Sequence, residues 1–298
     1  MADKHILHML TPLRHMSPFD VNMALDSGYD AVVPYTEVTL EEVTGLVQDA
    51  MFSRPPKTGL RTGIFFGGKQ AIAALDMLDA AKKALVPPFG ISFFADPAGS
   101  FTTAAAMVAY VEKLLRDKKN RALKGVRVAV FGATGVVGFS AAVISALQGA
   151  EVTLVGYDGI KRVSEGAAEI KARFGTEVKA ADGSDDAKKA AILASAEIAF
   201  CAGRAGVQII SKAQLDTAKG LLIVADVNAV PPAGVEGLDV MANGAALNTH
   251  GTLGLGPLAI GNIKYKTESG LFRKMIEAAK PVCFDFRDAF TLARDLNG

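Results

Sequence analysis

Three glycines at a fixed spacing, Gly132, Gly135 and Gly138, mark the segment with the clearest chemistry. They lie between the strand-like run Lys124–Phe131 and a helix-like stretch. In such a turn the first glycine permits tight bending, the second lets a pyrophosphate approach the backbone, and the third lets the helix pack on the strand. The helix N-terminus presents free N–H groups to phosphates. The loop predicts dinucleotide contacts at Gly132, Thr134, Gly135, Val136, Val137 and Gly138; a phosphate-free turn that merely needs glycine is the alternative.

The end of the next predicted strand bears on the choice between NAD and NADP. Asp158 follows Gly138 by about 20 residues, where an acid accepts hydrogen bonds from the ribose hydroxyls of NAD. Its carboxylate would repel the 2′-phosphate of NADP, whereas Lys161 and Arg162 would attract that phosphate. We therefore expect both cofactors to be used, with NAD at least as good as NADP and Tyr157 as a further contact.

Two later strand ends complete the predicted cofactor site. The small residues Ala202 and Gly203, followed by Arg204, would let the nicotinamide ribose approach the backbone. Asn228 follows the strand Leu221–Val227, where an amide can meet the nicotinamide carboxamide. A turn-forming role for Asn228 is the alternative.

The segment Asp96–Thr103 carries the most specific features apart from the glycines. Asp96, Ser100, Thr102 and Thr103 are all residue types that cap helices, and they stand where a strand gives way to a helix. A simple helix cap is one interpretation. A polar floor for a substrate is the other, because four such groups exceed what one cap needs. Gly67–Lys69 and Arg14–Asp20 follow other strands in the same way, as ordinary turns or as parts of the site.

Strand and helix patterns alternate along the chain, which favours parallel sheets. The predicted strands lie near His5–Leu10, Tyr29–Tyr35, Leu60–Phe66, Gly90–Ala95, Lys124–Phe131, Glu151–Asp158, Thr176–Ala180, Glu197–Ala202 and Leu221–Val227. The predicted helices include Phe19–Leu25, Leu40–Met51, Lys69–Leu85, Phe101–Lys118, one or two within Pro257–Ala279, and Phe286–Leu296.

These patterns predict an α/β protein of two lobes with its active site in the cleft between them. Residues 1–121 are expected to form a parallel α/β domain that binds substrate and that helices within 267–298 complete. Residues 122–266 are expected to form a Rossmann-type dinucleotide-binding domain.

Composition narrows the class of protein. With 32 basic and 31 acidic residues among 298, the net charge of +1 argues against a general nucleic-acid or anionic membrane surface. The two cysteines have no metal-type spacing. Neither a signal peptide nor an apolar run of transmembrane length is visible, so we expect a cytoplasmic protein. The four histidines are scattered and none stands out as a general base, which favours a hydride transfer without a proton relay.

Over essentially its whole length the chain resembles the NAD(P)-dependent methylenetetrahydromethanopterin dehydrogenases of methylotrophic bacteria. The segments that carry the resemblance are His8–Leu13, Met16–Met23, Asp96–Thr103, Val227–Gly234 and Gly254–Lys266. The resemblance implies oxidation of a pterin-bound methylene group to the methenyl cation during formaldehyde oxidation. It also implies that the protein is a homo-oligomer, specifically a trimer.

The resemblance also implies roles for individual residues. Phe19 would bracket the pterin, Lys264 would contact its pterin end, and the Asp96 segment would hold the substrate. The full set of substrate residues is Phe19, Asp20, Asp96, Pro97, Gly99, Ser100, Thr102, Thr103 and Lys264. The strictly NADP-dependent branch of the family carries a basic residue just after the second strand of the cofactor domain. This chain has Gly156-Tyr157-Asp158 there, a departure that puts strict NADP dependence in doubt.

Other classes of function remain open at this point. A methylenetetrahydrofolate dehydrogenase would carry a Tyr-x-x-x-Lys helix motif in the first lobe, yet only Tyr157 and Lys161 have that spacing, at the adenosine end of the cofactor lobe. A shikimate-type dehydrogenase would need a Lys/Asp pair, which Lys69 and Asp96 could imitate. A non-catalytic NAD(P)-binding redox sensor is the alternative from outside the enzymes.

Overall fold

The computed structural model describes residues 4–298, which divide into two compact units. The first unit comprises the chain up to Thr102 together with Tyr265–Leu292, and the second comprises Thr103–Lys264 and Ala293–Gly298. The division falls within helix α4 (Ser100–Lys119), whereas the boundary expected from the sequence lies just beyond the end of that helix, at residue 121.

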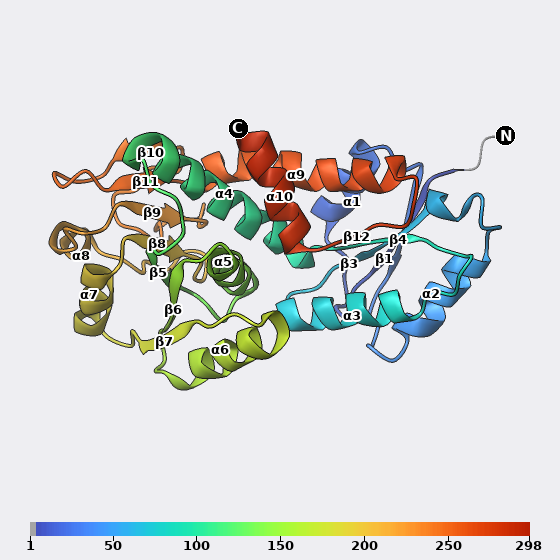
Figure 1. Cartoon of the computed structure of the whole chain (residues 1–298), viewed down its shortest axis with the longest axis horizontal. Coiled ribbons are helices and arrows are strands. Elements are labelled where there is room, and N and C mark those ends of the chain that lie inside the picture. Colours follow the sequence, from blue (N-terminus) through green and yellow to red (C-terminus); the bar gives the residue numbers. More distant parts are fainter. Residues whose placement is uncertain (1–3) are drawn as a thin grey trace. The chain divides into compact units, whose positions relative to one another are not determined.

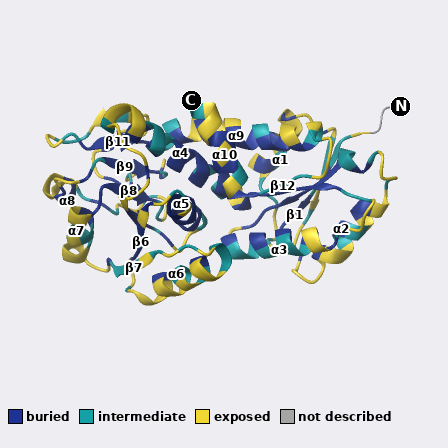
Figure 2. Ribbon diagram, viewed as in Figure 1, coloured by how far each residue is buried: buried dark blue, intermediate teal, exposed yellow. Residues whose placement is uncertain are grey.

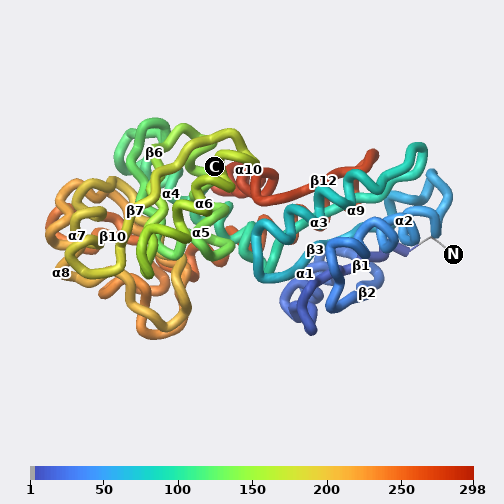
Figure 3. Tube along the Cα trace, turned by 90° about the horizontal axis from the view of Figure 1, so that it is seen from below, coloured from blue at the N-terminus to red at the C-terminus, as the bar shows by residue number. Residues whose placement is uncertain are grey.

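The first unit is built on a parallel sheet with the order β12-β4-β3-β1-β2. Its strands are β1 (Ile6–Leu10), β2 (Ala31–Tyr35), β3 (Thr62–Phe66), β4 (Ser92–Ala95) and β12 (Cys283–Phe284). The last of these comes from the far end of the chain and pairs with β4, as the red trace in Figures 1 and 3 makes visible. Counted along the chain the order is 2-1-3-4-5, a doubly wound arrangement whose direction reverses between β1 and β3.

Helices accompany the strands of this unit, and the sequence forms them in the expected order. They are α1 (Pro18–Asp26), α2 (Val43–Phe52), α3 (Ala71–Lys83), the 3-10 turns η1 (Gly59–Arg61) and η2 (Pro97–Gly99), and most of α9 (Pro257–Glu277) and α10 (Phe286–Asn297). Within residues 4–298 no helix combines the length and the apolar character needed to cross a membrane.

Aromatic packing holds the core of the first unit. All five residues of β3 are buried, as expected for a parallel strand covered on both faces (Figure 2). The rings of Phe65 and Phe94 lie 5.6 and 5.2 Å from the ring of Phe272 on α9. Since Phe272 is far from these strands in sequence, a C-terminal helix completes the N-terminal core.

The second unit contains a seven-stranded sheet with the order β10-β11-β9-β8-β5-β6-β7. Its strands are β5 (Arg127–Phe131), β6 (Glu151–Gly156), β7 (Lys179–Asp182), β8 (Ile198–Cys201), β9 (Ile223–Asp226), β10 (Asn243–Ala246) and β11 (Leu253–Leu255). Its helices are α5 (Val136–Leu147), α6 (Lys161–Phe174), α7 (Asp186–Ser195) and α8 (Lys212–Thr217), besides parts of α4, α9 and α10. The parallel strands follow the order 3-2-1-4-5-6 of dinucleotide-binding sheets, and β10 alone is antiparallel.

The sequence-based assignment failed mainly at the edge of this sheet. No strand was predicted in the glycine-rich stretch Thr249–Gly256, but it contains β11, which pairs with β10. The exposed and intermediate side chains of β10 give no apolar alternation that would indicate a strand. Strand β7 begins at Lys179, later than the predicted Thr176. Pro257–Glu277 forms one helix, which resolves the alternative of one or two.

A buried carboxylate ties the start of the second unit to its sheet. Oε1 of Glu197 accepts from Arg121 at 2.5 Å, and Oε2 accepts from the backbone N–H of Arg127 at 3.1 Å. The Arg127 guanidinium lies 3.3 Å from Oε2. Burial alone would raise the pKa of Glu197, but the two arginines and the N–H group outweigh it and lower that pKa.

This network predicts acid-dependent stability. Because the pKa of Glu197 is lower in the folded chain than the ordinary value of 4.5, its stabilisation is complete above that value and is lost as the pH falls through the folded pKa. We expect Glu197→Gln to reduce the free energy of unfolding by roughly 1–2 kcal/mol at neutral pH and by progressively less as the pH falls below the ordinary value of 4.5. Denaturant titrations at both pH values measure the difference.

The matched control is Glu151→Gln. Glu151 accepts from Lys179 at 3.4 Å, and the two side chains are 56% and 72% exposed, so their pairing contributes little. Equal losses in the two variants would contradict the role given to the buried network.

Candidate functional site

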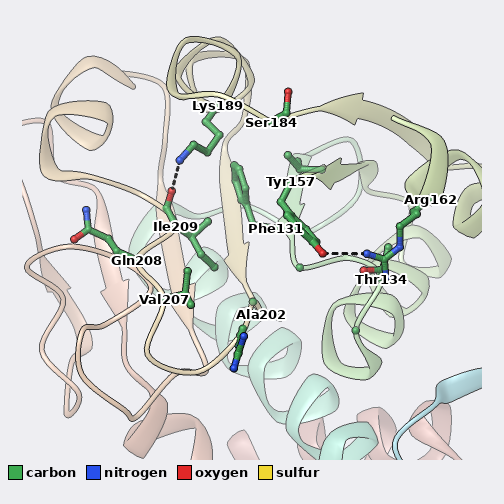
Figure 4. A pocket seen from close by; sticks show the side chains of 16 residues that line it. Phe131, Thr134, Tyr157, Arg162, Ser184, Lys189, Ala202, Val207, Gln208 and Ile209 are labelled. Atoms are coloured by element: carbon green, nitrogen blue, oxygen red, sulfur yellow. Dashed lines mark hydrogen bonds between the residues drawn. The ribbon is translucent and has the colours of Figure 1, made fainter. Parts of the chain in front are cut away.

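A pocket of about 580 Å³ in the second unit opens at the carboxyl ends of β5, β6, β7 and β8. This edge includes the point where the strand order reverses, between β5 and β8, at which doubly wound sheets bind their ligands. The residues that line it are Phe131, Gly132, Thr134, Gly135, Val155, Tyr157, Arg162, Gly183, Ser184, Lys189, Ala202, Gly203, Arg204, Val207, Gln208 and Ile209 (Figure 4).

The three glycines of the turn meet different surroundings. Gly132 has a φ of 77°, and a Cβ there would lie 2.3 Å from the carbonyl oxygen of Ala202. A Cβ on Gly138 would lie 2.4 Å from the carbonyl oxygen of Gly132. A Cβ on Gly135 would approach no protein atom closer than 3.3 Å, and Gly135 lines the pocket. Gly132 and Gly138 are therefore demanded by the fold, whereas Gly135 faces the space that a ligand would occupy.

Helix α5 begins at the pocket, and its N-terminus makes this part of the pocket suitable for binding an anion. Gly135 is the N-cap residue and offers no side chain to the first N–H groups of the helix. Those groups lack intrahelical partners and carry the positive end of the helix dipole. Together with the open backbone at Gly135, they form the kind of site that receives a phosphate or pyrophosphate.

The charges of the lining residues favour the same class of ligand. Arg162, Lys189 and Arg204 contribute three cations, and none of the 16 lining residues is acidic. Arg204 forms no side-chain hydrogen bond or ion pair within residues 4–298 and is exposed, so its guanidinium is available to an anion. The pocket is therefore electrostatically suited to a phosphorylated ligand.

A cluster of three side chains forms the rim at the end of β6. Nη1 of Arg162 donates to the hydroxyl of Tyr157 at 3.3 Å and lies 3.2 Å from Oδ2 of Asp158, and Figure 4 shows its contact with Tyr157. The bonds that Arg162 donates to Asp158 and Tyr157 raise the pKa of its guanidinium. Asp158 and Lys161 are exposed but do not line the pocket itself.

Sequence reasoning missed the far wall of the pocket. Gly183 and Ser184 follow β7, and Lys189 on α7 donates from Nζ to the carbonyl oxygen of Ile209 at 3.2 Å (Figure 4). The misplaced end of β7 hid these residues. The run Asp182-Gly-Ser-Asp185, a turn signal directly after a strand, could have identified them.

The amide of Asn228, predicted to meet a nicotinamide carboxamide, is engaged within the protein. Its Oδ1 accepts from the N–H groups of Val230 at 2.9 Å and Gly206 at 3.3 Å, and its Nδ2 donates to the carbonyl oxygen of Pro232 at 2.9 Å. The residue is buried and does not line the pocket. In this conformation Asn228 links two loops by hydrogen bonds, which corresponds to the turn-forming role given above as the alternative to a cofactor contact.

The first unit has a smaller pocket, about 340 Å³, at the equivalent place on its own sheet. It lies where β1 and β3 end, at the reversal of strand order. The lining residues are Thr11, Leu13, Arg14, His15, Met16, Ser17, Pro18, Asp20, Gly68, Lys69 and Ala98. Of the predicted substrate residues only Asp20 is among them, while the turns at Arg14–Asp20 and Gly67–Lys69 contribute most of the rest.

The Asp96 segment caps α4 from within the protein. Oδ1 of Asp96 accepts from the N–H of Phe101 at 2.7 Å and of Thr102 at 3.3 Å, and Oδ2 accepts from the Thr102 hydroxyl at 2.5 Å. Asp96 and Thr102 are fully buried, and Pro97 and Gly99 are buried as well. For Asp96 and Thr102 the helix-cap interpretation therefore describes the structure.

Partly exposed groups remain beside that cap. Ser100 and Thr103 are partly exposed, and Ala98, between Pro97 and Gly99, lines the pocket with a left-handed φ of 54°. Such a φ is unfavourable for a residue with a Cβ and is characteristic of functional segments. The buried cap thus holds a strained turn at the edge of a pocket.

Two further predicted substrate residues lie on helices. Phe19 lies on the first turn of α1 and its side chain is 48% exposed, so it is not a core residue. Lys264 lies on α9 and is 9% exposed.

Known proteins share the sequence and fold of this chain. Residues 18–98 match the family model described as methylene-tetrahydromethanopterin dehydrogenase, N-terminal. The chain is 54% identical over 295 residues to the NAD(P)-dependent methylenetetrahydromethanopterin dehydrogenase of Methylorubrum extorquens, covering 99% of each protein. It is 34% identical over 280 residues to the bifunctional protein MdtA of the same organism, covering 94% of each.

A solved structure supports the fold alone. The 5-ketofructose reductase of Gluconobacter sp. strain CHM43 matches with a TM-score of 0.53 and 17% identity, over 99% of this chain and 100% of that chain.

The surroundings of the glycines predict separable effects of substitution. Gly135→Val should weaken NAD binding by at least about tenfold, because the branched side chain occupies the path to the helix N-terminus, while thermal stability changes little. The extended backbone of Gly135, with φ −80° and ψ 163°, suits valine. Calorimetry with NAD and thermal unfolding measure the two effects.

Gly138→Ala is the contrasting variant, since even one methyl group collides with the backbone of the turn. It should lower the melting temperature before any question of binding arises. Unchanged NAD affinity in a folded Gly135→Val protein would count against the pocket as the cofactor site.

Proposed function

Because this chain belongs to the methylenetetrahydromethanopterin dehydrogenase family, we propose that it transfers a hydride from methylenetetrahydromethanopterin to NAD or NADP. The product is methenyltetrahydromethanopterin, formed during one-carbon (formaldehyde) oxidation. The main structural support for the proposal is the pocket of the second unit, which is suited to an anion. It lies where the strand order reverses and has the Gly132–Gly138 turn at its edge.

The chemistry requires no proton transfer. One C–H bond of the methylene carbon breaks, its electron pair leaves as hydride, and the carbon becomes a cation stabilised by the lone pairs of its two nitrogen neighbours. When bound, NAD(P) supplies the hydride acceptor. The task of the protein is then to hold and align the reactants rather than to act as an acid or base, a role in which proximity and orientation supply the rate enhancement.

The residues present fit a dinucleotide. The N-terminus of α5 and the open backbone at Gly135 would bind the pyrophosphate. Asp158 and Tyr157 would contact the adenosine ribose at the end of β6, and Lys161, Arg162 and Arg204 would bind phosphate oxygens. Thr134, Val136, Val137, Ala202 and Gly203 complete the proposed contacts.

For the substrate we propose the segments at the carboxyl ends of the first unit's strands. Phe19, half exposed on α1, offers a ring face to a flat pterin. Ser100 and Thr103 offer partly exposed hydroxyls, and Lys264 would contact the pterin end. The buried residues Asp20, Asp96, Pro97, Gly99 and Thr102 would act by holding this surface in shape.

One assay tests the function directly. Purified protein, NAD and methylenetetrahydromethanopterin should yield reduced nicotinamide, followed by its absorbance, and NADP should also serve as acceptor. Turnover with methylenetetrahydrofolate in preference to the methanopterin substrate would favour the folate enzyme, and turnover of shikimate would favour a shikimate-type dehydrogenase. NAD binding without turnover of any of these would favour the redox sensor.

The assembly, location and domains of the protein are also proposals. The family resemblance supports a homo-oligomer, and specifically a trimer, which light scattering of the purified chain tests. Cell fractionation tests the proposed cytoplasmic location. The proposed functions of the two lobes, substrate binding for the first and dinucleotide binding for the second, rest on the same resemblance and on the sheet order of each unit.

A mechanism without an acid or base predicts a flat pH profile. Turnover at saturating substrates should change by less than about threefold between about pH 6 and 8, because the reaction requires no side chain to accept or donate a proton. Burial lowers the pKa of His5 and of His8 below the ordinary value of 6.5, which favours the neutral form of both. A steep limb that disappears on replacing any one of the four histidines would contradict direct hydride transfer.

The rim at the end of β6 predicts which changes alter cofactor choice. Asp158→Ala should shift the ratio of kcat/KM values toward NADP by roughly five- to thirty-fold, because it removes a repelling charge and a ribose contact. It also releases Arg162 from its bond to Asp158. Steady-state kinetics with both cofactors measure the ratio.

Arg162→Ala is the opposing variant and should shift the ratio toward NAD, chiefly through the KM for NADP. If Asp158→Ala leaves the ratio unchanged, Tyr157 or the backbone must set the choice instead.

A further inference from the structure

The pocket of the second unit has one wall without regular secondary structure. This wall, the 203–209 loop, connects β8 to the segment before α8, and five of its residues line the pocket: Gly203, Arg204, Val207, Gln208 and Ile209. Its only backbone hydrogen bond within itself in the described structure joins the N–H of Val207 to the carbonyl of Arg204 at 3.3 Å. The loop therefore depends on neighbouring segments for its shape.

A second loop, residues 227–235 after β9, supplies anchors. Oδ1 of Asn228 accepts from the N–H of Gly206, near the middle of the 203–209 loop, at 3.3 Å. At the end of that loop, the N–H of Ile209 donates to the carbonyl oxygen of Gly234 at 2.7 Å. On the opposite side, Lys189 donates to the carbonyl oxygen of Ile209.

One buried carboxylate fixes both anchors. Oδ1 of Asp226, at the end of β9, accepts from the N–H of Asn228 at 2.9 Å. Its Oδ2 accepts from the N–H groups of Gly234 at 2.7 Å and Val235 at 3.2 Å. A Cβ on Gly234 would lie 2.9 Å from Oδ1, so the approach of this backbone to the carboxylate requires glycine.

Asp226 and Asn228 are 1% and 6% exposed, and neither lines the pocket. These two side chains can therefore affect a bound ligand only indirectly, through the loops that they hold in place. The pocket includes the ends of β6 and β7, where doubly wound sheets receive the adenosine half of a dinucleotide.

We propose that Asp226 and Asn228 are positioning residues that hold the 203–209 loop in the shape that binds the adenosine diphosphate half of the cofactor. This inference rests on the proposed function, because it takes the pocket to be the NAD(P) site. A loop released from its anchors has to be ordered at the moment of binding, which lowers the affinity without removing a direct contact.

The test uses the full-length protein, the Asn228→Ala variant and ADP, which has no nicotinamide. We expect the dissociation constant for ADP in calorimetry to rise about tenfold, and amide hydrogen exchange in residues 203–209 to accelerate. The KM for NAD should rise in parallel, while kcat at saturating NAD stays within about twofold. Asp226→Asn should accelerate exchange in the same loop, as a second route to the same readout.

The control is Asn248→Ala. Asn248 also fastens its own loop by three bonds: Oδ1 accepts from the N–H groups of His250 and Thr252, both at 3.1 Å, and Nδ2 donates to the carbonyl oxygen of Leu215 at 3.2 Å. It does not line the pocket, so its loss should leave ADP affinity and exchange in 203–209 unchanged.

Two results would overturn the proposal. If Asn228→Ala weakens NAD binding but leaves ADP binding intact, Asn228 contacts the nicotinamide end directly. If exchange in residues 203–209 does not change in either variant, the loop does not depend on these anchors. Failure of the wild-type chain to bind ADP would instead count against the proposed cofactor site, and the exchange measurement would still decide the anchoring.

Discussion

Backbone crowding at the start of α5 fixes how this helix and the central strands of the second unit pack together. The turn at Gly132 lies so close to Ala202, at the end of β8, that no side chain fits between them, and Gly138 brings the helix against the same turn. This close approach brings the ends of β5 and β8 and the N-terminus of α5 to one point. The pocket and the position of its anion-binding N–H groups follow from that contact.

The surrounding polar groups serve this geometry in two ways. Arg162, Lys189 and Arg204 line the pocket and supply charge, whereas the buried carboxylates of Asp226 and Glu197 do not line it and accept hydrogen bonds within the protein. Asp226 accepts backbone N–H groups, and Glu197 accepts from two arginines and a backbone N–H. Burial raises the pKa of Asp226, and the backbone N–H groups that donate to its carboxylate partly offset this rise. Both effects are expected for a buried carboxylate that orders loops and does not contact solvent.

The sequence predicts the central strands, the long helices and the glycine turn because each has a strong local signal. Strands β1, β3, β5 and β8 are rich in apolar residues, and α4 has a clear apolar stripe. The β10–β11 hairpin has no such signal, because the small and polar residues of β10 show no apolar alternation and β11 is only three residues long. The roles of Asp96 and Asn228 were left open for the same reason: a cap residue and a ligand contact look alike until the partner of each oxygen is known.

The pairing of β12 with β4 has a consequence for how the chain acquires its structure during synthesis. The sheet of the second unit has all its strands by Leu255, but the sheet of the first unit gains its last strand only at Cys283–Phe284, and its core needs Phe272. A ribosome that has made the first 100 residues has therefore produced a sheet with an uncovered edge at β4 and an incomplete aromatic core. Such an edge is open to pairing with other chains. The second unit thus has its complete sheet before the first does, and the N-terminal part of the nascent chain keeps an unpaired strand edge until β12 is made.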